Sequence, residues 1–267
     1  MIPTQTKLID SDGNAFGLKT VNGKPRVSSM TYLYDIAEGN IPDHGFISKF
    51  GHDPDTTNSA IAVWDGSVAY NYATSAETLY LSSSNNDDDQ IYEIQGLDAK
   101  WNLQTTTVTC NGFTGVALPG TWIRTFRIKN LGSTNNAGII YISTDSDTVA
   151  DGVPNPITTV RAQISVGRNQ TLMAIWSVPN DYIAYLTSFY ASAAATTAKT
   201  TEVVLWVRPF GGVFQTKKIF SINSGTTAQI QYDFPLRVEE KSDIRITANS
   251  SASSAVSAGF DAWYEKG

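Results

Sequence analysis

Apolar and polar residues alternate in short runs along most of the chain beyond residue 76. In the run WIRTFRIK (122–129), Trp122, Phe126 and Ile128 recur with a period of two, which is typical of a half-buried strand. The arginines of this run are expected on the opposite, solvent-facing side. Turn-forming clusters of Asn, Asp, Gly and Ser separate the runs. The pattern predicts strands over 78–81, 90–94, 107–110, 122–129, 137–143, 158–164, 170–176, 182–190, 202–207, 213–222, 228–234, 243–248 and 256–264.

Many short strands without an amphipathic helix of useful length indicate an all-β protein. The predicted fold is an antiparallel β-sandwich, jelly-roll-like, whose body covers residues 76–267. This body forms either one unit or two packed sub-sandwiches that divide near residue 165. Gly211-Gly212 is predicted as the turn of a hairpin with arms over 203–207 and 213–219.

Residues 1–75 lack this alternation and are predicted as an extended, loop-rich N-terminal arm. Asp12-Gly13 favours a short hairpin over 8–16, and Gly and Pro residues recur from 39 to 54. A short strand is expected over 32–36. An aromatic-bearing arm needs a surface to lie on, so the predicted interface residues are Tyr32, Tyr34, Phe46, Phe50 and Trp64.

Charge and cysteine content exclude several classes of protein. Only 16% of residues are charged, and the net charge of −6 comes with no Lys/Arg run, which disfavours nucleic-acid binding. The single cysteine, Cys110, allows no intrachain disulfide and is expected to pack as a small hydrophobe. Neither a signal peptide nor an apolar stretch of about 18 residues occurs, so no membrane segment is expected and the protein is predicted to stay soluble.

The candidate chemistry is sparse, and no enzyme is predicted. The two histidines, His44 and His52, form no zinc pattern, and no G-x-S-x-G nucleophile motif occurs. Asp145, Asp147 and Asp151 could gather a calcium ion, although acidic turns are the favoured interpretation of these residues and of Asp87–Asp89. No cofactor is expected.

Six tryptophans could stack on sugars, but most are expected elsewhere. Trp122, Trp176 and Trp206 lie in alternating runs and are predicted to fill the core, whereas Trp64 and Trp101 sit beside turns and could face a ligand.

Several segments resemble virion structural proteins of tailed phages, especially aquatic ones. They are SSSNNDDDQIYEIQGLDA (82–99), TTVTCNG (106–112), WVRPFGGVFQTKK (206–218), FPL (234–236), EKSDI (240–244) and SAGF (257–260), within residues 77–267. The resemblance implies a non-enzymatic particle component, foremost a capsid cement or decoration protein of the head, located in the virion and assembled in the host cytoplasm. Its implied partners are the major capsid protein and further copies of itself, as a trimer or dimer.

Two other functions stay open at the level of the sequence. One is a receptor-binding or adhesin module at the tail or collar, which would use Trp64 or Trp101. The other is a glycan hydrolase, since paired carboxylates can lie on distant strands.

Overall fold

The computed structural model describes residues 20–21, 24–25, 32–66, 68–146 and 151–267. The chain divides into two compact units, Met1–Pro42 and Asp43–Gly267. In the first unit, β1 (Thr20–Val21) pairs with β2 (Lys24–Pro25), and α1 spans Tyr32–Ala37. The strand predicted over 32–36 is therefore wrong. The segment forms a short helix, and Gly39, two residues after its end, has a φ of +73°. The predicted hairpin over 8–16 lies outside the described residues.

The second unit is nearly all β, and all its strand pairings are antiparallel, which confirms the predicted fold class at this level. Its elements are β3 (His44–Thr56), β4 (Ile61–Ala62), β5 (Tyr80–Ser83), β6 (Ile91–Asp98), β7 (Leu103–Thr109), β8 (Val116–Ala117), β9 (Trp122–Asn130), β10 (Ile140–Ser143), η1 (Ile157–Thr159), β11 (Val160–Ile164), β12 (Ile175–Ser177), β13 (Tyr182–Ala194), β14 (Thr200–Arg208), β15 (Gln215–Asn223), β16 (Thr226–Val238), β17 (Asp243–Ser250) and β18 (Ser254–Lys266).

Nine of these strands form two sheets that share one core. One sheet has the order β16-β13-β18-β3 and the other β12-β17-β14-β15, with β4 paired to β17. Phe189 and Phe260 of the first sheet and Leu205 and Ile246 of the second are fully buried in the same apolar cluster. We call β3 and β12–β18 the C-terminal body. Numbered along the chain from 1 (β3) to 8 (β18), its sheets read 6-3-8-1 and 2-7-4-5.

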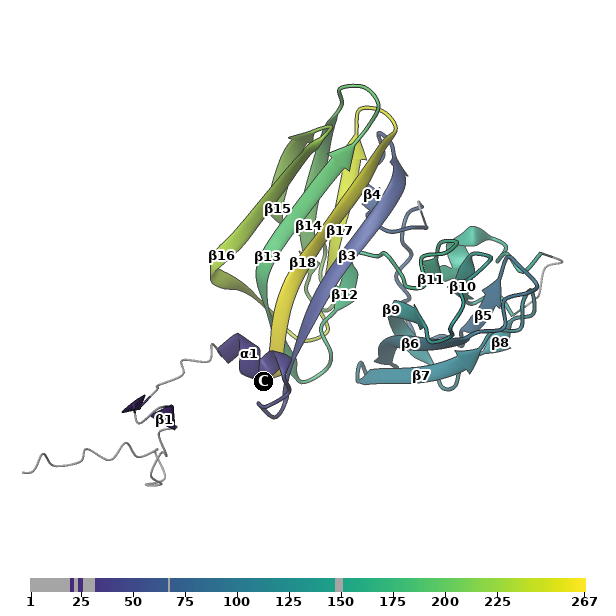
Figure 1. Cartoon of the computed structure of the whole chain (residues 1–267), viewed down its shortest axis with the longest axis horizontal. Helices are drawn as coiled ribbons and strands as arrows, with labels where there is room; N and C mark the ends of the chain where they lie inside the picture. The colour runs from purple at the N-terminus through teal and green to yellow at the C-terminus, as the bar shows by residue number, and fades with distance from the viewer. Residues whose placement is uncertain (1–19, 22–23, 26–31, 67, 147–150) are drawn as a thin grey trace, which may run out of the picture. The chain divides into compact units, whose positions relative to one another are not determined.

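Residues 63–174 are inserted between the first and second strands of this body. This inserted region holds two smaller sheets, with orders β11-β10-β5-β8 and β7-β6-β9 (Figure 1). They enclose a second apolar core that includes Leu81, Tyr92, Ile94, Ile128 and Ile142. Five buried side chains of the inserted region belong to the core of the C-terminal body, namely Val63, Leu97, Ile123, Phe126 and Ala174.

The predicted boundary of the N-terminal arm at residue 75 is corrected by β3. This strand pairs with β18 from His44↔Glu265 to Thr56↔Ser254, so residues 44–56 are part of the sheet β16-β13-β18-β3 (Figure 1). Gly51, which favours a loop in the sequence, sits where a Cβ would lie 2.0 Å from the Val63 carbonyl oxygen. It permits a close approach of the inserted region to the strand. Because β3 belongs to the same sheets as β12–β18, the predicted division near residue 165 does not separate the inserted region from the C-terminal body.

Candidate functional site

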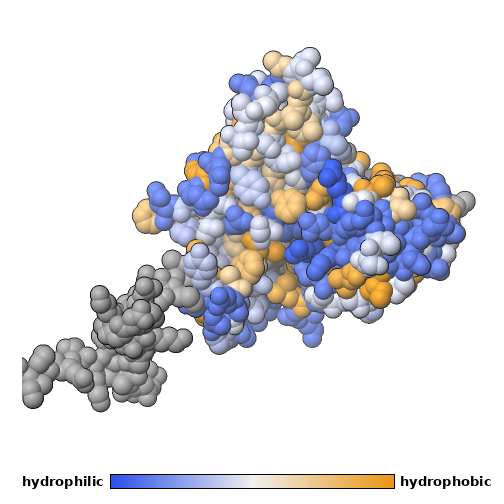
Figure 2. All heavy atoms as spheres, viewed as in Figure 1, coloured by the Kyte–Doolittle hydropathy of each residue, from blue (hydrophilic) through white to orange (hydrophobic). Residues whose placement is uncertain are grey.

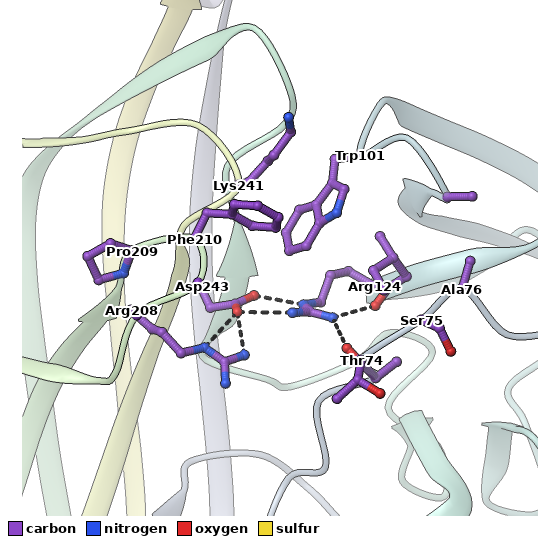
Figure 3. A pocket seen from close by; sticks show the side chains of 15 residues that line it. Thr74, Ser75, Ala76, Trp101, Arg124, Arg208, Pro209, Phe210, Lys241 and Asp243 are labelled. Carbon is purple, nitrogen blue, oxygen red and sulfur yellow. Dashed lines mark hydrogen bonds and ion pairs between the residues drawn. The ribbon is translucent and has the colours of Figure 1, made fainter.

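A cleft of about 600 Å³ lies where the inserted region meets the C-terminal body (Figure 3). The inserted region supplies the segment 73–76, the turn after β6 and part of β9. The body supplies the turn between β14 and β15 and the start of β17. The lining residues are Ala73, Thr74, Ser75, Ala76, Ala99, Trp101, Ile123, Arg124, Arg208, Pro209, Phe210, Gly211, Gly212, Lys241 and Asp243.

The buried carboxylate of Asp243 joins the two sides of the cleft. Arg124 donates from Nε to Oδ1 (2.7 Å) and from Nη2 to Oδ2 (3.0 Å), a bidentate pair. Arg208 donates to Oδ2 from Nε at 3.0 Å and from Nη2, and Ser177 Oγ donates to Oδ1. One carboxylate therefore fixes one arginine from each side of the cleft.

Aromatic rings flank both guanidinium groups. The Arg124 guanidinium lies 4.7 Å from the Trp101 ring centroid and 5.2 Å from that of Tyr72. Arg208 lies 4.5 Å from the Tyr72 ring and 4.6 Å from the Phe214 ring. Burial alone would lower the pKa of Arg124, but its hydrogen bonds to Asp243 and the charge of that residue raise it. Arg124 is therefore charged at any pH at which the protein is folded.

Local turns set the positions of the aromatic residues at the cleft. Asp98 Oδ1 accepts hydrogen bonds from the backbone N–H of Lys100 (2.8 Å) and Asn102 (2.9 Å), which places Trp101 between them at a φ of +66°. Across the cleft, the predicted hairpin between β14 and β15 is confirmed, and it carries Phe210. The two rings meet edge to face with centroids 5.7 Å apart.

The outer part of the cleft is more exposed than its base. Phe210 is 65% exposed. The Lys241 ammonium lies 5.6 Å from the centroid of the Phe210 ring, and its side chain is 26% exposed. By contrast, the side chains of Arg124 and Asp243 are 6% and 3% exposed. The accessible groups of the lining are thus an aromatic ring, cations and the hydroxyls of Thr74 and Ser75.

Sequence reasoning missed Arg124, which it assigned to the solvent side of its strand. In β9 every residue from Trp122 to Phe126 is buried, and the pairing with β6 is irregular between Trp122 and Arg127, so the period of two does not hold in this part of the strand. An arginine inside such a continuously buried run is the signal for a buried ion pair. Asp243, its partner, had no comparable signal because the pair joins strands far apart in the sequence.

The two predicted ligand-facing tryptophans behave differently. Trp101 lines the cleft, as expected. Trp64 is 1% exposed, donates from Nε1 to the carbonyl of Val68 at 2.7 Å and packs against Tyr70. It is therefore a core residue, and its prediction as an interface or ligand residue is wrong. The turn residues that follow Trp64 favoured an exposed position in the sequence. The apolar run Ile61–Trp64 instead enters the core.

The other predicted interface residues are exposed. Tyr32 (46%), Tyr34 (64%), Phe46 (56%) and Phe50 (41%) all present aromatic surface. The sequence missed Phe234, which is 90% exposed, and Val213, which is 74% exposed. Phe234 lies in β16 where the pairing with β13 jumps from Leu186↔Leu236 to Ser188↔Gln231, so residues 232–235 bulge from the ladder. Figure 2 shows apolar patches interspersed with polar surface on the viewed face.

The predicted calcium residues serve turns where they are described. Asp145 Oδ2 accepts a hydrogen bond from Asn155 N at 2.9 Å, and Asp151 Oδ1 accepts one from Val153 N at 3.1 Å. Asp147 lies outside the described residues. In the described part of the chain, no three His, Cys, Asp or Glu side chains form a group that could hold a metal ion.

The other polar candidates lie away from the cleft. Asp88 is buried and accepts hydrogen bonds from Ala137 N (2.7 Å) and Gly138 N (2.8 Å), so it stabilises a loop. His44 pairs with Glu265 at 3.0 Å, and His52 contacts Ser257 at 2.9 Å. Among the described helices, none is long and apolar enough to cross a membrane.

No protein-family model matches this sequence, and no curated protein is similar to it. Among solved structures, the infectious bursal disease virus Gt strain structure is 12% identical, covers 88% of this chain and 78% of its own, and has a TM-score of 0.24. The PBSX exported protein XepA is 13% identical. The match covers 98% of this chain and 100% of the XepA chain, with a TM-score of 0.19. The infectious bursal disease virus VP2 subviral particle is 10% identical. The match covers 89% of this chain and 82% of the VP2 chain, also with a TM-score of 0.19. Likeness at this level carries no argument about function.

Proposed function

We propose that this chain is a non-enzymatic structural component of a virus particle, a cement or decoration protein of the head that stabilises the capsid through protein–protein contacts. The proposal also includes the finer fold assignment, in which the C-terminal body is a jelly-roll sandwich. The observation that carries both is the pairing of its eight strands. β3 pairs with β18, β12 with β17, β13 with β16, and β14 with β15.

These pairs are first with last, second with seventh, third with sixth and fourth with fifth. Such nesting arises when one long hairpin rolls up into two sheets, which is the jelly-roll arrangement. Viral capsid domains use this arrangement, as do lectins and cupins. The segments that resemble phage virion proteins, such as WVRPFGGVFQTKK (206–218), favour the first of these classes.

Exposed apolar side chains on the C-terminal body support an interaction role. Phe46 and Phe50 are four residues apart in β3, so they project from the same side of this strand. Phe234 projects from the bulge of β16. Apolar surface of this kind gains free energy when a neighbouring subunit covers it. The proposed neighbours are the major capsid protein and further copies of this chain, as a trimer or dimer.

The test is quantitative mass spectrometry of purified particles, with heads and tails separated. The proposal expects the chain in the head fraction, in numbers comparable with those of the major capsid protein. Absence from the particle would end the proposal, and a few copies in the tail fraction would favour a receptor-binding module instead. Turnover of any member of a polysaccharide panel by the purified protein would contradict the non-enzymatic assignment.

The contact surface is tested by adding purified protein to heads that lack it. Phe46→Ser with Phe50→Ser is expected to reduce binding to the heads, because the double variant removes the two exposed phenylalanine side chains of β3. Thr227→Ala, at an exposed position of β16, is the control and is expected to bind as the unchanged protein does. Equal binding by the double variant would contradict a role for this surface.

A further inference from the structure

The cleft between the inserted region and the C-terminal body combines an exposed aromatic ring with an excess of positive charge. We propose that it binds a carboxylated glycan, with Phe210 and Trp101 against the apolar face of a sugar ring and Lys241 at its carboxylate. The inference does not depend on the proposed role in the particle, because the cleft can hold a ligand wherever the chain is located.

The charge of the lining favours an anion. The lining includes three cationic side chains, those of Arg124, Arg208 and Lys241, and one carboxylate, that of Asp243. Asp243 accepts hydrogen bonds from both arginines, so it cannot neutralise them both. The Lys241 ammonium lies 3.8 Å from Glu240, too long for a tight pair, and the same Glu240 oxygen accepts a hydrogen bond from Asp181 N. The cleft is therefore locally positive on a protein whose net charge is −6.

The buried and exposed cations have different tasks. Arg124 uses Nε and Nη2 on Asp243 and Nη1 on the carbonyls of Ala73 (2.8 Å) and Ile123 (2.7 Å), so its role is to fix the base of the cleft. The Arg208 side chain, which is 27% exposed, and that of Lys241 remain accessible to a ligand. Arg208 already donates from Nε and Nη2 to Asp243, whereas the Lys241 side chain points away from this pair beside Phe210 (Figure 3), so Lys241 is the cation offered to a ligand carboxylate next to the aromatic rings.

The aromatic residues favour a sugar over a simple anion. An exposed ring offers an apolar face to the C–H groups of a pyranose, and Trp101, edge-on to Phe210, extends this apolar wall. The hydroxyls of Thr74 and Ser75 belong to the opposite segment of the lining, beyond Arg124 (Figure 3). They can exchange hydrogen bonds with sugar hydroxyls.

The dimensions and charge disfavour a nucleic acid. Binding a phosphate backbone needs a track of Lys and Arg, whereas this cleft has a volume of about 600 Å³ and the protein has a net negative charge. That volume suits a ligand of one to a few sugar rings.

The test is isothermal titration calorimetry of the full chain with a short oligogalacturonate and with its methyl ester. The two probes have nearly the same shape, but the ester lacks the negative charge. The acid is expected to bind about tenfold more tightly than the ester, and more weakly as salt is added. No binding of the acid, or equal binding of both, would overturn the proposal.

Two pairs of variants locate the site. Lys241→Gln and Phe210→Ala are each expected to weaken binding of the acid about tenfold, since each removes one recognition group. Their matched controls are Lys217→Gln and Phe234→Ala, which remove an exposed lysine on β15 and the exposed phenylalanine on β16. Circular dichroism confirms that each variant is folded. Binding that is unchanged in both cleft variants would place the ligand elsewhere and refute the site. The result is independent of the particle experiment, so either proposal can fail alone.

Discussion

Two buried ionisable side chains, Lys49 and Asp65, lie where β3 meets the inserted region. Lys49 is 5% exposed, and its Nζ donates to the carbonyl of Phe126. Burial, together with the charge of Arg127, lowers its pKa to about 7, and the charge of Asp65 opposes the shift. Burial raises the pKa of Asp65 to about 7, against the hydrogen bonds that Ser165 donates to its Oδ2 at 3.0 and 3.1 Å.

These shifts predict a minimum in the free energy of unfolding near pH 7. Between the ordinary pKa of 3.8 and about 7, the folded protein holds a proton on Asp65 that the unfolded chain has lost, so stability falls as pH rises. Between about 7 and 10.5, the unfolded chain holds a proton on Lys49 that the folded protein has lost, so stability rises with pH. Urea unfolding at a series of pH values measures both limbs.

Substitutions assign the two limbs of this profile. Asp65→Asn is expected to flatten the falling limb, and Lys49→Met the rising limb, because each removes one of the two groups. A wild-type profile that is flat or has its maximum near pH 7 would contradict the assignment.

The second prediction at the residue scale concerns the stability contributed by the Asp243 carboxylate. Asp243→Ala leaves Arg124, whose side chain is 6% exposed, without its counter-charge, and is expected to lower the free energy of unfolding by about 3–5 kcal/mol. The control is Glu239→Ala, which breaks the exposed pair with Arg237 and is expected to cost less than about 1 kcal/mol. Urea denaturation compares them, and equal losses would show that the buried network is not stabilising.

At the scale of the elements, the sequence predicts most strands after residue 76 but does not predict β3. The alternation from residue 76 onward predicted most strands of the body, because each repeats apolar residues with a period of two. β3 has Gly45, Gly51 and Pro54, which are loop signals, and its strand state depends on pairing with β18 about 200 residues later in the chain. The cleft was equally hidden: Trp101 could be chosen from its turn, but the Arg124–Asp243 pair is a tertiary contact.

The role of β3 predicts opposite outcomes for two truncations. A chain that begins at Asp43 keeps the compact unit, and its melting temperature is expected to stay within a few degrees of the full chain's. A chain that begins at residue 57 loses β3, so it leaves an edge of β18 unpaired and uncovers buried Ala258 and Phe260. It is expected to aggregate. Differential scanning fluorimetry and the soluble fraction distinguish the two. A stable protein from residue 57 would restore the arm boundary predicted from the sequence.

At the scale of the whole molecule, the inserted region and the C-terminal body are joined by more than two crossings of the chain. Ile123 and Phe126 of β9 belong to the same apolar cluster as Val207 and Ile244 of the body. Val63 N donates to Ile246 O at 2.9 Å, and Ile246 N donates to Ala174 O at 3.0 Å, so backbone hydrogen bonds also cross the junction. The buried Arg124–Asp243 pair adds a charged link. Separating the two parts would expose apolar surface and leave buried polar groups without partners.

This coupling predicts that residues 43–267 unfold in one transition, although chains of this length often unfold in parts. Leu205→Ala in the first core and Ile94→Ala in the second remove fully buried side chains, each at a cost of about 2–5 kcal/mol. Differential scanning calorimetry of the chain that begins at Asp43 is expected to show a single peak, which both substitutions shift to lower temperature as a whole. If the two parts were independent, each substitution would move only its own peak. Two resolved transitions would therefore mean that one part can unfold while the other stays folded, which would contradict the coupling.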